Sequence, residues 1–262
     1  MATDYYCGHA HFDENGRMPL TNLTDLHPNM LQNIDVYRVQ AGESFLLELP
    51  EEECALLLVE GQASFVWDGN ERAVSRPTPF DPAYCLHVCH GTKAEVRASS
   101  VCELLVQSTP NGRDFPPVFY EPGNYRDDTF GQGQFEGKAQ RTVRTFFDIK
   151  NAPYSNMVCG EILIPQGGWS SYPPHEHPQP EVYYYRFGHP NGFGACFLYN
   201  DDVYEVNAIF DRCYVAIPGG MYHPQVNAPG YAMYYVWMIR HFADYPWTER
   251  NFDPNHEWLL KQ

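Results

Sequence analysis

The frequency of prolines and glycines is the feature that most limits how this chain can fold. Its 262 residues include 22 prolines and 20 glycines, and proline interrupts helices because it lacks a backbone N–H and its ring clashes with the preceding turn. The pieces between these residues are short, and hardly any has the three-and-four spacing of an amphipathic helix. Since 19 tyrosines and 16 phenylalanines add further strand-forming side chains, the sequence predicts an all-β protein.

Strand-like runs fall into two series, separated by turn clusters. The first series is predicted at residues 36–39, 44–49, 55–59, 63–67, 86–88, 95–98 and 103–107, and the second at 143–149, 157–164, 181–187, 194–199, 204–209, 213–217 and 231–239. Between Pro110 and about Gln140 the sequence is rich in proline, glycine and charge, without a strand-like run. We therefore predict an N-terminal domain over residues 1–112, a connecting segment over 113–141 and a similar C-terminal domain over 142–262.

Composition narrows the class of partner. The formal net charge is −16 and there are only 17 lysines and arginines, which argues against binding to nucleic acid and favours a small molecule. No apolar run approaches the roughly 18 residues needed to span a bilayer, and the N-terminus is polar, so we expect a cytoplasmic protein without membrane contact. The eight cysteines form no CxxC pair, which predicts free, buried thiols.

The stretch "PPHEHPQPE" carries the chemistry. His175 and His177 are two residues apart, and the strand period of two puts both imidazoles on one face. Glu181 returns to that face if the "PQP" loop keeps the register, and His223, after the Gly219–Gly220 turn, can come back over the same pocket. Imidazoles with a carboxylate suit Zn, Mn, Fe, Co or Ni, and the absence of thiolates argues against a structural zinc. The predicted divalent-metal ligands are His175, His177, Glu181 and His223.

The same residues match both parts of the cupin signature. The first part is supplied by Gly168, His175, His177, Glu181 and Gly188, and the second by Pro218, Gly220, His223 and Asn227. Arg212 stands where the second part usually begins with glycine. The other histidines lack such spacing: "GHAH" at residues 8–11 is interpreted as a solvated terminal segment, and His87 and His90 as structural or surface residues.

Longer motifs resemble one family within the cupins. "WSSYPPHEH", "EVYYYRF", "VAIPGGMYHPQVNAPGYAMYYVWM" and "PWTERNFDPNHEWL" are similar to the 5-deoxy-glucuronate isomerase family of bacterial myo-inositol catabolism, a bicupin. The resemblance implies two tandem cupin domains, which are jelly-roll-like β-barrels, with the metal only in the second. It also implies an aldose–ketose isomerase of carbohydrate metabolism that converts 5-deoxy-glucuronate into 5-dehydro-2-deoxy-gluconate. The chain departs from the family at Glu176, where a lysine is usual, and in its short "PQP" loop, so an isomerase of another uronate is an alternative.

An isomerase must also move a proton and hold its substrate. Strand alternation puts Tyr183 and Tyr185 on the face of Glu181, so these three, or a hydroxide at the metal, are candidates for proton transfer. Arg186 has the planar fork that suits a substrate carboxylate, although alternation puts it on the opposite face, and Tyr172 is a second candidate for substrate binding. A non-catalytic cupin that binds a sugar acid and an Fe(II) dioxygenase remain alternatives. The aromatic strands are also compatible with a homo-oligomer.

Overall fold

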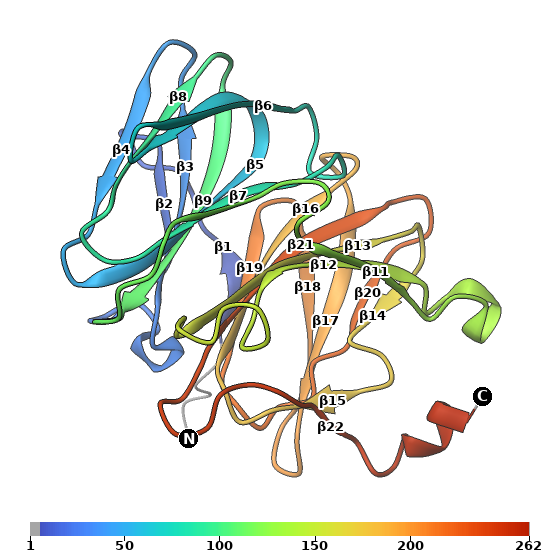
Figure 1. The fold of residues 1–262 in the computed structure, drawn as a ribbon. Helices are drawn as coiled ribbons and strands as arrows, with labels where there is room; N and C mark the ends of the chain where they lie inside the picture. Colours follow the sequence, from blue (N-terminus) through green and yellow to red (C-terminus); the bar gives the residue numbers. More distant parts are fainter. Residues whose placement is uncertain (1–5, 262) are drawn as a thin grey trace. The chain divides into compact units, whose positions relative to one another are not determined.

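The structure is a computed structural model that describes residues 6–261, and within them it contains strands and short 3-10 helices but no α-helix. The all-β prediction is therefore confirmed. The chain divides into two compact units, both visible in Figure 1. We call residues 10–125 with 146–157 the N-terminal unit, and residues 6–9, 126–145 and 158–261 the C-terminal unit. The tandem-cupin organisation with boundaries at residues 112 and 142 stays a prediction.

The N-terminal unit is a nine-stranded antiparallel sheet wrapped around one core. Six strands follow the order β10-β7-β5-β9-β3-β2, and β4, β6 and β8 join through β5 and β8. Its elements are β2 (Arg17–Thr21), η1 (Pro28–Met30), β3 (Asn33–Val39), β4 (Ser44–Glu48), β5 (Glu52–Trp67), β6 (Asn70–Arg76), β7 (Tyr84–Val88), β8 (Lys93–Ala98), β9 (Cys102–Pro110) and β10 (Val118–Tyr120).

Strand β5 replaces two strands that the sequence predicted separately. Its first half pairs with β7 and β9 and its second half with β6 and β8, and the register shifts between Leu58 and Glu60. Gly61 follows this bulge with φ 122°, and a Cβ added there would lie 2.6 Å from Cys102 Sγ. Glycine therefore allows one long strand to bend and serve both parts of the sheet.

The C-terminal unit contains sheets of seven, four and two strands, in the orders β1-β19-β16-β21-β13-β12-β11, β14-β20-β17-β18 and β15-β22. The last two residues of β12, 146–147, and the first residue of β13, 157, belong to the N-terminal unit. The elements are β1 (Tyr6–His9), β11 (Arg126–Phe130), η2 (Gln134–Gly137), β12 (Arg141–Phe147), β13 (Met157–Ile164), β14 (Trp169–Ser170), β15 (His175–Glu176), β16 (Glu181–Phe187), β17 (Phe193–Tyr199), β18 (Tyr204–Phe210), β19 (Cys213–Ile217), β20 (Gln225–Asn227), β21 (Met233–Arg240), β22 (Asn251–Phe252) and η3 (Glu257–Lys261).

One core joins the two larger sheets of the C-terminal unit. Tyr183 and Tyr185 of β16 and Trp237 of β21 belong to the same buried cluster as Leu198 of β17 and Ile209 of β18. The seven- and four-stranded sheets therefore pack face to face, with alternate side chains of each strand pointing inward. The predicted sharing of one strand face by Tyr183 and Tyr185 is confirmed.

Some expectations at the level of elements are wrong. Strands β10 and β11 form in the stretch in which no strand was predicted. Residues 6–9 are not a free tail, because β1 pairs with β19 and places the exposed His9 opposite Cys213. His11 is exposed and lies outside any strand.

All eight cysteines are free and six of them are buried, as predicted. No helix within residues 6–261 is long and apolar enough to cross a bilayer.

Candidate functional site

Three of the four predicted ligands converge in the C-terminal unit. Nε2 of His177 lies 3.1 Å and Nε2 of His223 3.4 Å from Oε2 of Glu181. All three side chains are buried, and one ligand atom of each lies within 4.8 Å of the others. We call His177, Glu181 and His223 the histidine–glutamate cluster. Its atom types and spacing could hold a metal ion.

Two glycines bring the halves of this motif together. Gly220 N–H donates to the carbonyl oxygen of His177 at 2.9 Å, which docks the turn before His223 onto the histidine loop. At Gly219 an added Cβ would lie only 1.7 Å from the carbonyl oxygen of Pro178, so a side chain there would push the turn away. The conformation of the "PGG" turn thus places His223 beside His177.

Backbone carbonyls orient the imidazoles of the cluster. Nδ1 of His177 lies 3.0 Å from the carbonyl oxygen of Gln179, and Nδ1 of His223 lies 2.7 Å from that of Met221. Because a carbonyl only accepts, each Nδ1 donates, and each Nε2 is turned toward the carboxylate of Glu181.

This orientation suits a bound cation. Burial lowers the pKa of His223 to about 4, so at neutral pH its imidazole is uncharged and Nε2 carries a lone pair. That lone pair faces a carboxylate oxygen, which is also an acceptor. Two acceptors in contact are unfavourable alone, whereas a divalent cation would be attracted by both. The residues present therefore fit the metal that the cupin signature implies.

His175 lies beside the cluster but is not one of the three residues that meet the 4.8 Å spacing. Its ring centroid is 5.3 Å from that of His223, its side chain is buried, and its Nδ1 lies 3.0 Å from the carbonyl oxygen of Pro173. Burial lowers the pKa of His175 well below its usual value, with the His223 imidazole as the next contribution. As at His223, Nδ1 faces a backbone carbonyl and burial lowers the pKa, but the assignment of His175 as a ligand stays a prediction.

The two predicted tyrosines occupy different positions. The Tyr183 hydroxyl donates to Oε2 of Glu181 at 3.0 Å, whereas the Tyr185 hydroxyl donates to Oε1 of Gln225 at 2.6 Å. Burial raises the pKa of each phenol well above 10, so both remain protonated at neutral pH. Tyr183 alone of this pair is hydrogen-bonded to the cluster.

The structure does not bring Arg186 to the cluster. Its Nε lies 3.0 Å from Oδ1 of Asp211, and the pair is buried. Arg186 is near the end of β16 opposite to Glu181 and on the other strand face, as alternation predicts. Arg212 lies in the turn between β18 and β19 and has φ 61°. A non-glycine residue therefore adopts the left-handed conformation at the position where the cupin signature usually has glycine.

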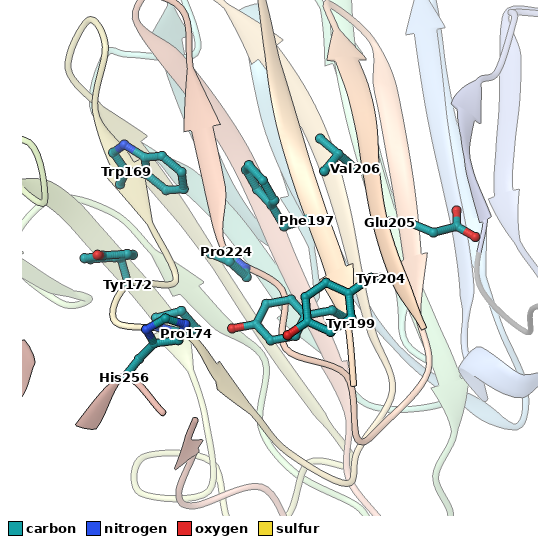
Figure 2. A pocket seen from close by; sticks show the side chains of 10 residues that line it. All are labelled: Trp169, Tyr172, Pro174, Phe197, Tyr199, Tyr204, Glu205, Val206, Pro224 and His256. Atoms are coloured by element: carbon teal, nitrogen blue, oxygen red, sulfur yellow. The ribbon is translucent and has the colours of Figure 1, made fainter. Parts of the chain in front are cut away.

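Tyr172 lines a groove of about 270 Å³ next to β14 and β17. Figure 2 shows Trp169 and Tyr172 at one side of this groove and Tyr204 and Val206 at the other. None of the three cluster residues lines it. The role of Tyr172 in substrate binding stays a prediction.

Sequence reasoning missed several neighbours of the cluster. The ring of Tyr235 lies 4.7 Å from that of Tyr183, and its hydroxyl is 2.7 Å from Oγ of Ser170. Tyr235 is opposite Tyr185 in the β16–β21 register, so the alternation that selected Tyr183 and Tyr185 could have selected it too. Arg141 of β12, whose Nη2 donates to the carbonyl oxygen of Tyr172 at 3.1 Å, had no spacing signal.

The fold and this cluster define the class of protein, an all-β cupin-fold protein with a buried candidate metal site. The same fold occurs in the oxalate decarboxylase of Lactobacillus farciminis, with a TM-score of 0.70 at 13% identity over all of this chain and 91% of that one. The model of the KduI/IolB family matches residues 7–259, so the chain belongs to that family.

Relatives within the family are similar over most of their length. A 5-deoxy-glucuronate isomerase of Geobacillus thermodenitrificans is 28% identical, over 87% of this chain and 85% of that protein. The 5-deoxy-glucuronate isomerase of Bacillus subtilis strain 168 is 26% identical, over 87% of each. The crystal structure of an IolB-like protein of Salmonella typhimurium LT2 superposes with a TM-score of 0.86 at 28% identity, over 97% of this chain and 98% of that one.

Proposed function

We propose that this protein is a metal-dependent aldose–ketose isomerase that converts 5-deoxy-glucuronate into 5-dehydro-2-deoxy-gluconate in inositol degradation. Membership of the KduI/IolB family and the names of the relatives support this reaction. The observation that carries the proposal is the buried cluster of His177, Glu181 and His223 with the Tyr183 hydroxyl bonded to Glu181.

The residues that would hold the metal are His175, His177, Glu181 and His223. A divalent ion in this position supplies a Lewis acid that stabilises negative charge developing on the substrate oxygens. By ligand type, this set is compatible with Zn, Mn, Fe, Co or Ni. The carbonyl bonds at Nδ1 of His177 and His223 would keep each Nε2 aimed at the same point.

Isomerisation takes a proton from the carbon next to the carbonyl and delivers one to the former carbonyl carbon. The carboxylate of Glu181 can accept a proton, and the Tyr183 hydroxyl donates a hydrogen bond to Oε2 of that carboxylate, with 3.0 Å between the two oxygens. The raised pKa of Tyr183, caused mainly by burial, makes its hydroxyl a donor and not a base. We therefore assign proton movement to Glu181 and Tyr183, and a packing role to Tyr185.

A specific observation favours a second candidate, an isomerase of another uronate. Glu176 stands between the two histidines, and its Oε1 accepts a hydrogen bond from Nδ2 of Asn251 at 2.6 Å. A carboxylate where the family usually has a lysine removes a positive charge from the histidine loop, and a different charge there favours a different acidic sugar.

The reaction is tested by incubating the metal-loaded protein with 5-deoxy-glucuronate in D2O and following the sugar by NMR. We expect the ketose to form, with deuterium entering at the former carbonyl carbon when the proton exchanges with solvent. Tight binding with unchanged sugar would indicate a non-catalytic cupin, and oxygen uptake a dioxygenase. Turnover of a different uronate alone would favour the second candidate.

A further inference from the structure

Arg141 is a buried cation without an acidic partner. The residue is only 8% exposed, Nη1 donates to the carbonyl oxygen of Ala139 at 2.8 Å, and Nη2 donates to that of Tyr172 at 3.1 Å. Within residues 6–261 no carboxylate forms an ion pair with it, although the chain has 33 acidic residues. By contrast, the buried Arg144 pairs with Glu161 at 2.8 Å and the buried Arg186 with Asp211 at 3.0 Å.

Burial of an unpaired guanidinium is unfavourable. Desolvation by burial is the main cause that lowers the pKa of Arg141, and carbonyl oxygens only partly replace the lost water because they carry no net charge. A buried charge is normally retained where an opposite charge meets it. An anion that comes from outside the chain would complete this site.

Arg141 lies beside the proposed reaction centre, and two chains of contacts connect them. The carbonyl that it binds belongs to Tyr172, and the next residue, Pro173, accepts the hydrogen bond of His175 Nδ1. On the other side, Tyr235 interacts electrostatically with Arg141, and the Tyr235 ring lies 4.7 Å from Tyr183. Tyr183 in turn donates to Glu181.

A second arginine, Arg250, interacts electrostatically with His175, His223 and Arg141. In the β15–β22 pairing, Glu176 is opposite Asn251, and continuing that register places Arg250 opposite His177. Arg250 is exposed, and its positive charge contributes to lowering the pKa of His175, His223 and Arg141. Two guanidinium groups thus lie around one cluster in a chain whose net charge is −16.

We propose that Arg141, assisted by Arg250, binds the carboxylate of the sugar-acid substrate. This inference rests on the proposed function for the identity of the sugar. A guanidinium has more N–H donors than the two carbonyl bonds of Arg141 use, and its planar fork matches a carboxylate. Arg141 and Arg250 would then determine specificity for acids, while the cluster acts on the aldehyde end. Arg141 and Arg250 thus take the role of carboxylate binding that the sequence suggested for Arg186, because Arg186 is already paired with Asp211.

The contrasting possibility is that Arg141 only anchors the carbonyls of Ala139 and Tyr172. That role needs N–H donors and no net charge, so it predicts equal losses on charged and uncharged sugars. The test therefore compares 5-deoxy-glucuronate with the analogue in which a primary alcohol replaces the carboxylate. Both are measured with wild-type protein, Arg141→Gln, Arg141→Lys and Arg250→Gln, with Lys261→Gln as an exposed control that loses the same charge.

We expect Arg141→Gln to raise the KM for the acid about 10- to 100-fold, since a hydrogen-bonded charge is lost. The KM for the alcohol should change less than about threefold, with kcat for the acid and the metal content near wild type. Arg250→Gln should shift the acid-to-alcohol preference in the same direction by a smaller factor, and Lys261→Gln should not change it. An unchanged preference in Arg141→Gln and Arg250→Gln would overturn the inference.

Calorimetric binding of the acid separates this inference from the proposed reaction. If wild-type protein binds the acid without isomerising it and Arg141→Gln loses that binding, the carboxylate site stands and the reaction is wrong. If wild-type protein isomerises the acid and the variants keep its affinity, the reaction stands and the carboxylate site is wrong. If Arg141→Gln does not fold, the acid-to-alcohol preference is measured in Arg141→Lys and Arg250→Gln instead. Arg141→Lys keeps the positive charge, and Arg250→Gln alters an exposed residue.

Discussion

Tyr183 and Tyr185 show how much of this site depends on single side-chain partners. They are two residues apart on one strand face, yet one hydroxyl bonds Glu181 and the other bonds Gln225. Their burial is nearly identical, at 2% and 0% exposed. The difference between a residue that can move a proton and one that supports the core is therefore set by the partner and not by exposure.

Replacing Tyr183 with Phe should separate these roles. The variant removes the hydroxyl that donates to Glu181 while keeping the ring, so we expect kcat to fall about 100-fold or more, with metal content near wild type and a stability loss of about 1–3 kcal/mol. Tyr185→Phe is the matched control. It leaves the buried Gln225 oxygen without its donor, which should cost about 1–3 kcal/mol of stability and leave kcat within a few-fold. A wild-type kcat for Tyr183→Phe would contradict the assignment.

The sequence predicted a site of histidines and a carboxylate, but not every residue around it. The two-residue spacing of His175 and His177 and the cupin signature located the cluster, because these patterns follow from strand alternation. Arg141 was not predicted, since it comes from a strand distant in the sequence and its significance lies in lacking an acidic partner. Such a property exists only in three dimensions.

Among the elements, strand β5 shows where periodicity succeeds and where it does not. Both runs at residues 55–59 and 63–67 are strands, but they form one element that bends at a bulge and at Gly61. The two-residue strands β14, β15 and β22 were not predicted. Elements this short have no measurable period, and their conformation depends on the strand with which they pair.

Gly61→Ala should destabilise the N-terminal unit. The residue has φ 122°, and the added Cβ would lie 2.6 Å from Cys102 Sγ and 2.8 Å from Cys102 Cα, so strain and a steric clash add. We expect a loss of about 2–4 kcal/mol in urea unfolding. Gly42→Ala is the control, because it also has positive φ (85°) but nothing within 4 Å of its Cβ, and should lose about 1 kcal/mol. Equal losses would show that packing against Cys102 is unimportant.

For the whole molecule, the proposed chemistry lies within one unit. The C-terminal unit supplies every cluster residue, Arg141 and Arg250. In the N-terminal unit, Nε2 of the fully buried His87 lies 3.0 Å from Oε2 of the buried Glu53, and the His87 ring stacks on that of Phe147 at 4.0 Å between ring centroids. This packing agrees with a structural interpretation of His87. The inclusion of β1 in the C-terminal unit was not predicted, because position in the sequence does not determine the strand with which a terminal segment pairs.

The proposed isomerisation depends on a metal ion held by the histidine–glutamate cluster. The most direct measurement is the metal content and isomerase activity of protein purified without chelator, before and after removal of the metal. Glu181→Gln, which removes a carboxylate of the cluster, is compared with Glu176→Gln, which removes the neighbouring one. We predict a divalent ion in the wild type and in Glu176→Gln, activity that is lost on chelation and restored by the ion, and at least about a tenfold weaker metal affinity in Glu181→Gln. Full activity in protein shown to be free of metal would show that isomerisation does not depend on a metal at this cluster.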